Sequence, residues 1–133
     1  MKRSKNIFVK LCNCHCPNVN NIVDCYYKEG EYYITLLIGE NRTNFWQITQ
    51  NEHDILIEFL TKHGYLDNGK HSKFYRFKQG ARDYIININH VTTFSYETRR
   101  VYTQDGGSFN MNIYKNELEQ FVQFLKNCGY YDE

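Results

Sequence analysis

The sequence has little alanine, little proline, almost no net charge and no long apolar run. Its 133 residues include one Ala and one Pro, and the formal net charge is +1. A chain this close to neutral has no overall field to steer it onto nucleic acid, and it is not an acidic mimic of DNA. The longest apolar stretch, 34–38, is interrupted by Thr35 and is far too short to span a bilayer. The basic start lacks the continuous apolar segment of a signal peptide. We therefore expect a cytoplasmic protein with no membrane partner.

Motifs for catalysis are also missing. The sequence contains no G-x-x-x-x-G-K-[ST] loop, no G-x-G-x-x-G loop, no H-E-x-x-H pair and no Ser-His-Asp signature. An enzyme of this length would normally show one such motif, so we expect a non-enzymatic protein without a resident cofactor. A cysteine–histidine pair involving Cys128 has no motif support, and a buried or helix-capping role is the simpler explanation of these residues.

An internal repeat is the clearest feature that is present. The segments EHDILIEFLTKHGYLD (52–67) and ELEQFVQFLKNCGYYD (117–132) share Glu, Phe, Leu, Gly, Tyr and Asp at a constant offset. Both read as helices, because apolar residues recur with helical spacing. Asn51 and Asn116 are suitable N-cap residues, and Gly64 and Gly129 stand where a left-handed C-cap is needed. The repeat therefore predicts two helices, each with an N-cap residue at its start and a C-cap glycine at its end.

The segments ahead of these helices read as strands, joined by turns that contain Gly30 or the sequence DGG at 105–107. The predicted strands cover 6–12, 31–38, 44–49, 73–78, 83–89, 99–104 and 108–114. We predict an α+β fold made of two tandem-duplicated units, each a meander of about four strands plus one helix. The first unit covers 1–66, the junction 67–72 and the second unit 73–133, and together they form one pseudo-twofold antiparallel-sheet domain.

The stretch 85–125 resembles part of a known family. It contains a strand with INHVTTF, a hairpin over DGG and a capped helix, which is similar to the first half of LytTR-type DNA-binding domains. The same pattern is found in many small PH-like bacterial modules. The resemblance covers about a third of the chain, and the two strands that should follow the helix have no room before Glu133. It implies a DNA-binding function but does not assign the chain to the family.

Tyrosine is unusually frequent, with 12 residues. Several occur as adjacent pairs, and adjacent residues of a strand point to opposite faces, so some rings must be exposed. Exposed Tyr is favoured at protein interfaces. We predict that the partner binds to one of two equivalent sides. One side carries Tyr102, Tyr114, Arg100 and Asn112 of the second unit, and the other lies around Tyr27 and Tyr32 of the first unit. This partner would be a host protein, a ribonucleoprotein complex or a second copy of the chain.

This profile favours a small binding protein that inhibits or titrates a host macromolecule. The many residues with A/T-rich codons, Lys, Asn, Ile, Tyr and Phe, indicate an AT-rich genome such as that of a low-GC bacterium or its phage. A phage or mobile-element inhibitor of host defence, of which anti-CRISPR proteins are one type, fits these properties.

A DNA- or RNA-binding regulator is the alternative. Basic and aromatic residues interleave at 73–82, and such strands can bind single-stranded nucleic acid by stacking and backbone contacts. The candidate residues are Lys73, Tyr75, Arg76, Lys78 and Arg82. A charged edge strand that resists aggregation would show the same pattern.

A second alternative is a zinc-dependent protein built on the cysteine cluster CNCHC. Four soft ligands could come from Cys12, Cys14, Cys16 and Cys25. The C-x-C-x-C spacing crowds three thiols on one side of an extended segment, so small apolar residues at a strand end are the competing interpretation.

Overall fold

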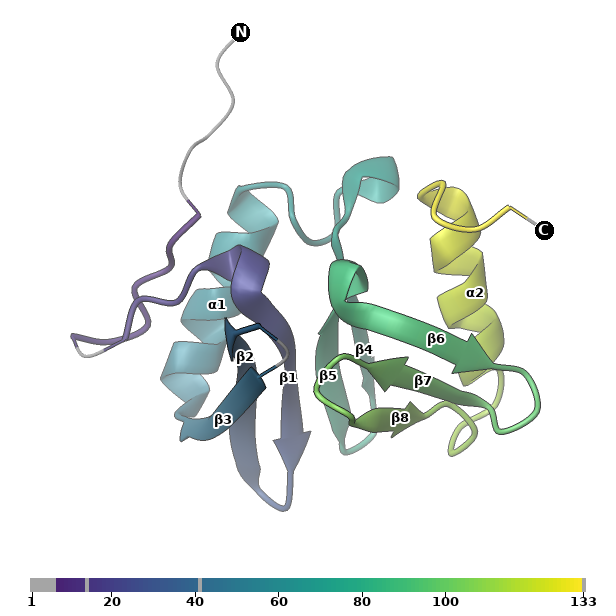
Figure 1. Ribbon diagram of the computed structural model, residues 1–133, viewed down its shortest axis with the longest axis horizontal. Coiled ribbons are helices and arrows are strands. Elements are labelled where there is room, and N and C mark those ends of the chain that lie inside the picture. The colour runs from purple at the N-terminus through teal and green to yellow at the C-terminus, as the bar shows by residue number, and fades with distance from the viewer. Residues whose placement is uncertain (1–6, 14, 41, 133) are drawn as a thin grey trace, which may run out of the picture.

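The computed structural model describes residues 7–13, 15–40 and 42–132, which form eight strands and two α-helices in this part of the chain (Figure 1). Three short 3-10 turns, η1 to η3, connect or precede them. In chain order the elements are η1 (Val19–Asn21), β1 (Ile22–Lys28), β2 (Glu31–Gly39), β3 (Arg42–Ile48), α1 (Gln50–Lys62), η2 (Gly69–His71), β4 (Phe74–Gln79), β5 (Arg82–Asn87), η3 (Ile88–His90), β6 (Val91–Ser95), β7 (Arg100–Thr103), β8 (Ser108–Asn110) and α2 (Glu117–Asn127).

The strands form two antiparallel sheets. The larger sheet has five strands in the order β3-β2-β1-β5-β4, and the smaller has three in the order β6-β7-β8. The pairing of β1 with β5, in which Cys25 is opposite Ile85, joins the first half of the chain to the second. The predicted α+β class with antiparallel strands is confirmed.

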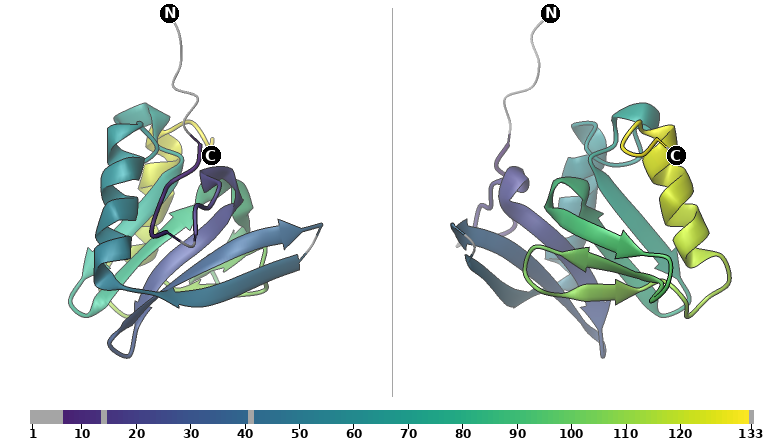
Figure 2. Two further views of the ribbon diagram at one scale, coloured as in Figure 1. Left: turned by 90° about the vertical axis from the view of Figure 1, so that its left-hand side faces the viewer. Right: turned by 45° about the vertical axis from the view of Figure 1, so that its right-hand side comes forward.

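One face of the five-stranded sheet is covered by α1 and by the segment that precedes β1 (Figure 2). Ile34 and Ile85 of the sheet pack there with Leu56 and Leu60 of the helix, and each of these residues is at most 1% exposed. Alternate residues of β5 face opposite sides, so Tyr84 and Ile86 belong to a second core.

This second core lies between the five-stranded sheet, the three-stranded sheet and α2. It contains Tyr75 and Ile86 from the larger sheet, Val101 from β7, and Leu118 and Phe121 from α2. The larger sheet is therefore the middle layer, with α1 on one side and β6–β8 together with α2 on the other (Figures 1 and 2).

Both helices end in the same way, as the repeat predicted. Gly64 and Gly129 have φ values of +77° and +78°. The N–H groups of Tyr65 and Tyr130, which follow them, donate to Leu60 O and Leu125 O at 2.8 Å. These bonds satisfy carbonyl groups that would otherwise be unpaired at a helix end.

The start of α1 differs from the prediction. Thr49, not Asn51, is the N-cap, because its hydroxyl accepts from Glu52 N while the Glu52 carboxylate accepts from Thr49 N. This capping box satisfies two backbone donors at once. At α2 the predicted Asn116 is the N-cap residue, but it has φ +65° and its side chain makes no capping bond.

Two predicted strands are wrong in extent. The described residues of the strand predicted at 6–12, which are 7–12, form a single bridge, Phe8 to Asn18, because Pro17 has no N–H with which to continue a ladder. The strand predicted at 108–114 ends at Asn110, whose side-chain Oδ1 accepts from Asn112 N at 2.9 Å and turns the chain.

The order of three strands followed by a helix occurs twice, in 22–62 and 91–127. The β4–β5 hairpin precedes the second set and pairs with the first. The tandem duplication, its pseudo-twofold relation and the boundaries at 66 and 73 stay predictions. None of the helices in the described part of the chain is long and apolar enough to cross a membrane.

Candidate nucleic-acid interface

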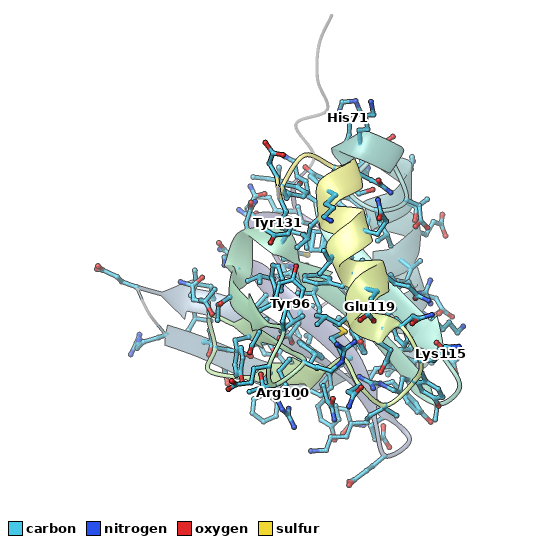
Figure 3. All side chains as sticks on the ribbon, turned by 90° about the vertical axis from the view of Figure 1, so that its right-hand side faces the viewer. His71, Tyr96, Arg100, Lys115, Glu119 and Tyr131 are labelled. Carbon is cyan, nitrogen blue, oxygen red and sulfur yellow. The ribbon has the colours of Figure 1, made fainter. Side chains whose placement is uncertain are left out.

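The outer face of the three-stranded sheet carries two of the predicted partner-binding residues. Arg100 and Tyr102 both point outward from β7, since Val101 and Thr103 between and after them are buried. Arg100 is paired with Asn110 and Tyr102 with Ser108 across the β7–β8 ladder. Arg100 Nη1 donates to Ser108 Oγ at 3.0 Å, so its guanidinium lies over β8. Figure 3 shows Arg100 on this side of the molecule.

The other predicted residues lie elsewhere. Asn112 is exposed on the loop after β8, and Tyr114 packs against the β4–β5 turn, where its hydroxyl leaves no room for a side chain at Gly80. Tyr27 and Tyr32 contact each other with ring centroids 4.9 Å apart, at the opposite end of the β1–β2 pair from Ile22. Arg100 and Tyr102 therefore share one face, and Asn112 and Tyr114 lie on the loop after β8. The choice between this side and the side around Tyr27 and Tyr32 stays a prediction.

The structure also brings Arg100 and Tyr27 to the two sides of one cavity of about 470 Å³. We call it the inter-sheet groove, because β1 and β5 of the larger sheet form one wall and β7–β8 form the other. Its lining residues are Asp24, Tyr26, Tyr27, Lys28, Arg82, Asp83, Tyr84, Arg100, Asp105, Gly107, Ser108, Phe109, Asn110 and Ile113.

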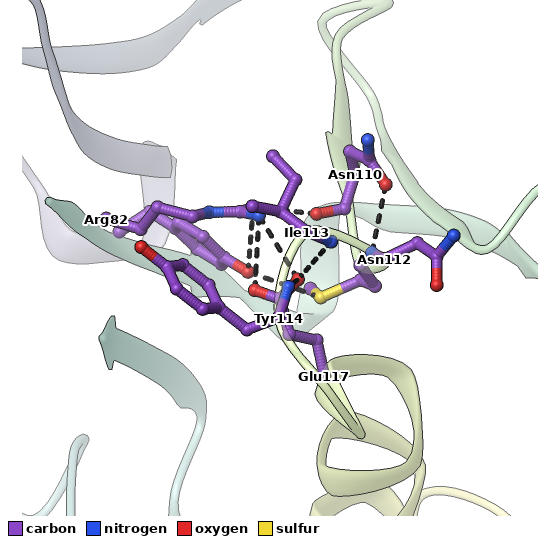
Figure 4. Close-up of polar contacts among 8 residues, drawn as sticks. Arg82, Asn110, Asn112, Ile113, Tyr114 and Glu117 are labelled. Carbon is purple, nitrogen blue, oxygen red and sulfur yellow. Dashed lines mark hydrogen bonds and ion pairs between the residues drawn. The ribbon is translucent and has the colours of Figure 1, made fainter. Parts of the chain in front are cut away.

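A network around Arg82 fixes the end of the groove (Figure 4). Arg82 Nη1 lies 3.1 Å from the fully buried carboxylate of Glu117, and Arg82 Nη2 donates to Asn110 O at 2.7 Å. Glu117 Oε1 also accepts from Ile113 N and Tyr114 N at 2.7 and 2.8 Å. These bonds join the larger sheet, the loop after β8 and α2, so the groove wall is held from three elements.

The charge of the groove is set by which side chains are already paired. Arg82 is neutralised by Glu117, whereas Lys28 is exposed and Arg100 donates to a neutral hydroxyl. Among the acidic residues, the carboxylate of Asp83 accepts hydrogen bonds from Nε and Nη2 of Arg76 at 3.2 and 3.3 Å. Two basic groups therefore remain available to a ligand at the surface of the groove.

Two carboxyl groups meet in the floor of the groove. Asp24 of β1 is 2% exposed, and Asp105 lies in the turn between β7 and β8. Burial raises the pKa of Asp24 to about 7. A hydrogen bond with Thr35 lowers this pKa, whereas the charge of Asp105 and a hydrogen bond with its carboxyl group raise it. Asp105 Oδ1 accepts from Thr103 Oγ1 and Gly107 N, which holds the turn closed.

The basic–aromatic strand at 73–82 is mostly engaged inside the protein. Tyr75 is 8% exposed and belongs to the second core. Arg76 pairs with Asp83, and Arg82 is part of the network described above. Lys73 and Lys78 are exposed, with Lys73 Nζ 5.5 Å from the centre of the Tyr65 ring. The rings of this strand are thus not available for stacking on bases.

A second polar cluster lies on the α1 side of the larger sheet. His53 is 2% exposed, with Nε2 3.8 Å from Asp83 Oδ2 and the Tyr32 ring stacked on it at 4.0 Å. Burial lowers the pKa of His53, against the opposing effect of Asp83. A cavity of about 670 Å³ adjoins this cluster and is lined by Tyr32 and Asp83 among others.

The four cysteines that the structure describes lie at different depths. Among the described residues, no group of three or more His, Cys, Asp and Glu side chains is arranged to hold a metal ion. Cys25 is fully buried in the first core, and burial raises the pKa of its thiol well above the usual range. Cys12 is half-buried and Cys16 is exposed. Cys14 lies outside the described residues, so the four-cysteine zinc site stays a prediction.

The sequence did not single out Asp24, Lys28 or Asn110. Asp24 lies within the strand-like stretch NNIVDCYYK, where an acidic residue reads as a solvent-facing position. The antiparallel pairing of β1 with β5 and the packing of β7–β8 across it bury this side chain. No local pattern in the sequence indicates either contact.

Comparison with known proteins adds one observation. No protein-family model and no curated protein matches the chain. Among solved structures, the chain is similar to one described as the LytTr DNA-binding domain of a methyl-accepting/DNA response regulator from Bacillus cereus. The two share 14% sequence identity with a TM-score of 0.51, and the match covers 90% of this chain and 94% of that chain. The likeness shows a shared fold, and it extends well beyond the stretch 85–125 in which the sequence suggested it.

Proposed function

We propose that the protein binds nucleic acid, as a small DNA- or RNA-binding regulator, through the inter-sheet groove and the outer face of β7–β8. The observation that carries the proposal is the presence of two basic side chains at the groove to which no carboxylate is bonded in the described structure. Lys28 and Arg100 lie on opposite walls with no carboxylate bonded to either in the described structure. On the same wall as Arg100, Asn110 and Ser108 also line the groove, and their amide and hydroxyl groups can donate to phosphate oxygens or to base edges.

The shared fold supports the same proposal, because the similar structure is described as a DNA-binding domain. The net charge of +1 sets the expected strength of binding. Two phosphate contacts, from Lys28 and Arg100, predict a slope of about −2 in a plot of log affinity against log salt concentration for duplex DNA. Binding should therefore be moderate and weaken only gently as salt is added.

The test is fluorescence anisotropy with labelled duplex and single-stranded DNA over a range of about 50 to 200 mM salt. The double variant Lys28→Ala/Arg100→Ala should bind about tenfold or more weakly at the lowest salt, and its salt slope should fall towards zero. The matched control is Arg42→Ala/Lys70→Ala, which removes the same charges from two exposed positions outside the groove.

The control variant should bind almost as tightly as the unaltered protein. Equal losses in the two double variants would mean that net charge alone, and not the groove, governs the interaction. The absence of any binding to duplex or single-stranded DNA or RNA at low salt would refute the proposal. The inhibitor hypothesis, its anti-CRISPR form included, has no support from the comparisons. It stays a prediction, as does the absence of enzymatic activity.

A further inference from the structure

β4 is an edge strand of the larger sheet, so one side of its backbone has no neighbouring strand. Among the described residues it pairs only with β5. Ile88 N donates to Lys73 O at 3.0 Å, which shows that Lys73 bonds towards β5. Alternate residues of an antiparallel strand bond to the same neighbour, so the odd-numbered residues of β4 also bond to β5. The backbone N–H and C=O groups of Phe74, Arg76 and Lys78 therefore point to the open side.

The chain itself uses this open side at one end. Phe74 N donates to Tyr65 O at 3.0 Å, a bond between the first residue of β4 and the segment that follows α1. Further along, no described residue bonds to the backbone of Arg76 or Lys78. Each of these two residues therefore offers one donor and one acceptor to another strand. Proteins add an extended segment to such an edge through main-chain hydrogen bonds.

A cleft of about 460 Å³ lies beside this open edge, and we call it the edge cleft. Phe74 and Tyr75 point to opposite faces of the sheet and both line it, so the cleft lies at the edge and not over one face. Its other walls come from Leu66 and η2 on one side and from Phe124 of α2 on the other. An extended segment placed here would meet both main-chain partners and apolar side chains.

The walls of the edge cleft are held together by contacts within the protein. Tyr130 Oη donates to Ser72 O at 2.9 Å, and Cys128 Sγ donates to Gly69 O at 3.2 Å. The Tyr75 ring packs on that of Phe124 with the centroids 5.0 Å apart. These contacts fix α2 against η2 and β4, so the cleft exists before a ligand arrives.

Lysine side chains border the open edge. Lys70 lines the edge cleft, and Lys73 and Lys78, beside and within β4, are exposed. None of the ion pairs in the described part of the chain involves these lysines. Asp67 is the one acidic residue among the described residues that line the cleft. A second copy of the chain would bring lysines against lysines, whereas an acidic strand would meet opposite charges.

We infer that the edge cleft docks an extended acidic segment of a partner protein, which joins β4 as an added antiparallel strand. Residues opposite Arg76 and Lys78 would exchange both main-chain bonds with them and point to the same face, so acidic side chains there reach Lys78. The intervening residues would point towards Phe124 and should be apolar. The inference goes beyond nucleic-acid binding and does not depend on it.

The probe is a fluorescent synthetic peptide in which glutamate and valine alternate, with both ends blocked, and binding is measured by anisotropy. The glutamates would be the residues whose N–H groups face β4. Methylation of the glutamate backbone nitrogens should therefore weaken binding about tenfold or more, because it removes several main-chain donors. Methylation of the valine nitrogens, which would face away from β4, should change binding little.

Two substitutions at one position test the same edge from the protein side. Lys78→Pro removes an N–H that points away from β5, so the sheet keeps its own bonds. Lys78→Ala loses the same charge and keeps the N–H. We expect Lys78→Ala to weaken binding about threefold, the scale of one exposed ion pair, and Lys78→Pro to weaken it about tenfold more. A thermal melt confirms that each variant is folded, and the methylated peptides decide the question with the unaltered protein if Lys78→Pro is not.

The outcomes either support the inference or overturn it. It is overturned if the unmethylated peptide does not bind. Equal binding of the two methylated peptides, or equal losses in Lys78→Pro and Lys78→Ala, would mean that charge alone attracts the peptide, and this also overturns it. A dimer in light scattering that Lys78→Pro dissociates would assign the edge to a second copy instead. None of these results affects nucleic-acid binding at the inter-sheet groove, which is tested at Lys28 and Arg100.

Discussion

Replacement of Asp24 by Asn should stabilise the protein at neutral and alkaline pH. Asp24 is 2% exposed, accepts a hydrogen bond from Thr35 and faces the carboxyl group of Asp105. Burial is the largest cause of the rise in its pKa from 3.8 to about 7. The folded state therefore keeps a proton that the unfolded state has already lost, over the whole interval between these two values.

The sign and size of the effect follow from this difference. Above pH 4 the folded state binds more protons than the unfolded state, so stability falls as pH rises, and the fall ends near pH 7. A shift of about three units at about 1.36 kcal/mol each corresponds to roughly 4 kcal/mol lost across this interval. Asp24→Asn cannot ionise, so it should match the unaltered protein near about pH 4 and exceed it by up to roughly 4 kcal/mol near about pH 8.

Urea unfolding followed by circular dichroism at several pH values between these limits measures the difference directly. His53 has the opposite pH dependence, because burial lowers its pKa and its stabilising effect is lost as pH falls through the unfolded value. That effect is present in both proteins and cancels when their stabilities are subtracted. A difference between Asp24→Asn and the unaltered protein that does not change with pH would refute the assignment of a raised pKa to Asp24.

Two other predictions concern folding stability. Thr49→Ala should lower the free energy of unfolding by about 1 kcal/mol, because it removes the N-cap acceptor of the Glu52 N–H. The control Asn51→Ala should change this free energy little. An equal or larger loss in Asn51→Ala would favour Asn51, the N-cap that the sequence predicted. Arg82→Met should cost about 3 to 5 kcal/mol by leaving the buried carboxylate of Glu117 without its cation. Adding Glu117→Met should restore part of that loss, and urea denaturation that showed additive losses in the double variant would contradict the network.

The sequence by itself determined the local structure. The two helices, their glycine C-caps and most of the strands follow from periodicity and turn residues, because neighbouring residues within one segment decide them. The N-cap of α1 was predicted at Asn51, but the sequence also contains the signal for the observed cap at Thr49, since T-Q-N-E at 49–52 is a capping-box pattern. The early end of β8 depends on the side chain of Asn110 bonding to its own backbone, which competes with strand continuation and which alternation alone does not reveal.

Only the tertiary structure decided the candidate site. The pairing of β1 with β5 connects residues about 60 positions apart, and a strand pattern carries no information about which partner it will find. That pairing and the packing of β7–β8 across it bury Asp24 and leave Lys28 and Arg100 facing one groove. The β4–β5 hairpin pairs Arg76 with Asp83, and the docking of α2 pairs Arg82 with Glu117. A basic residue's role depends on whether a carboxylate reaches it in the folded state. The sequence cannot show that Arg76 and Arg82 of the segment 73–82 are paired with carboxylates and that Tyr75 is buried, whereas Lys73 and Lys78 stay exposed.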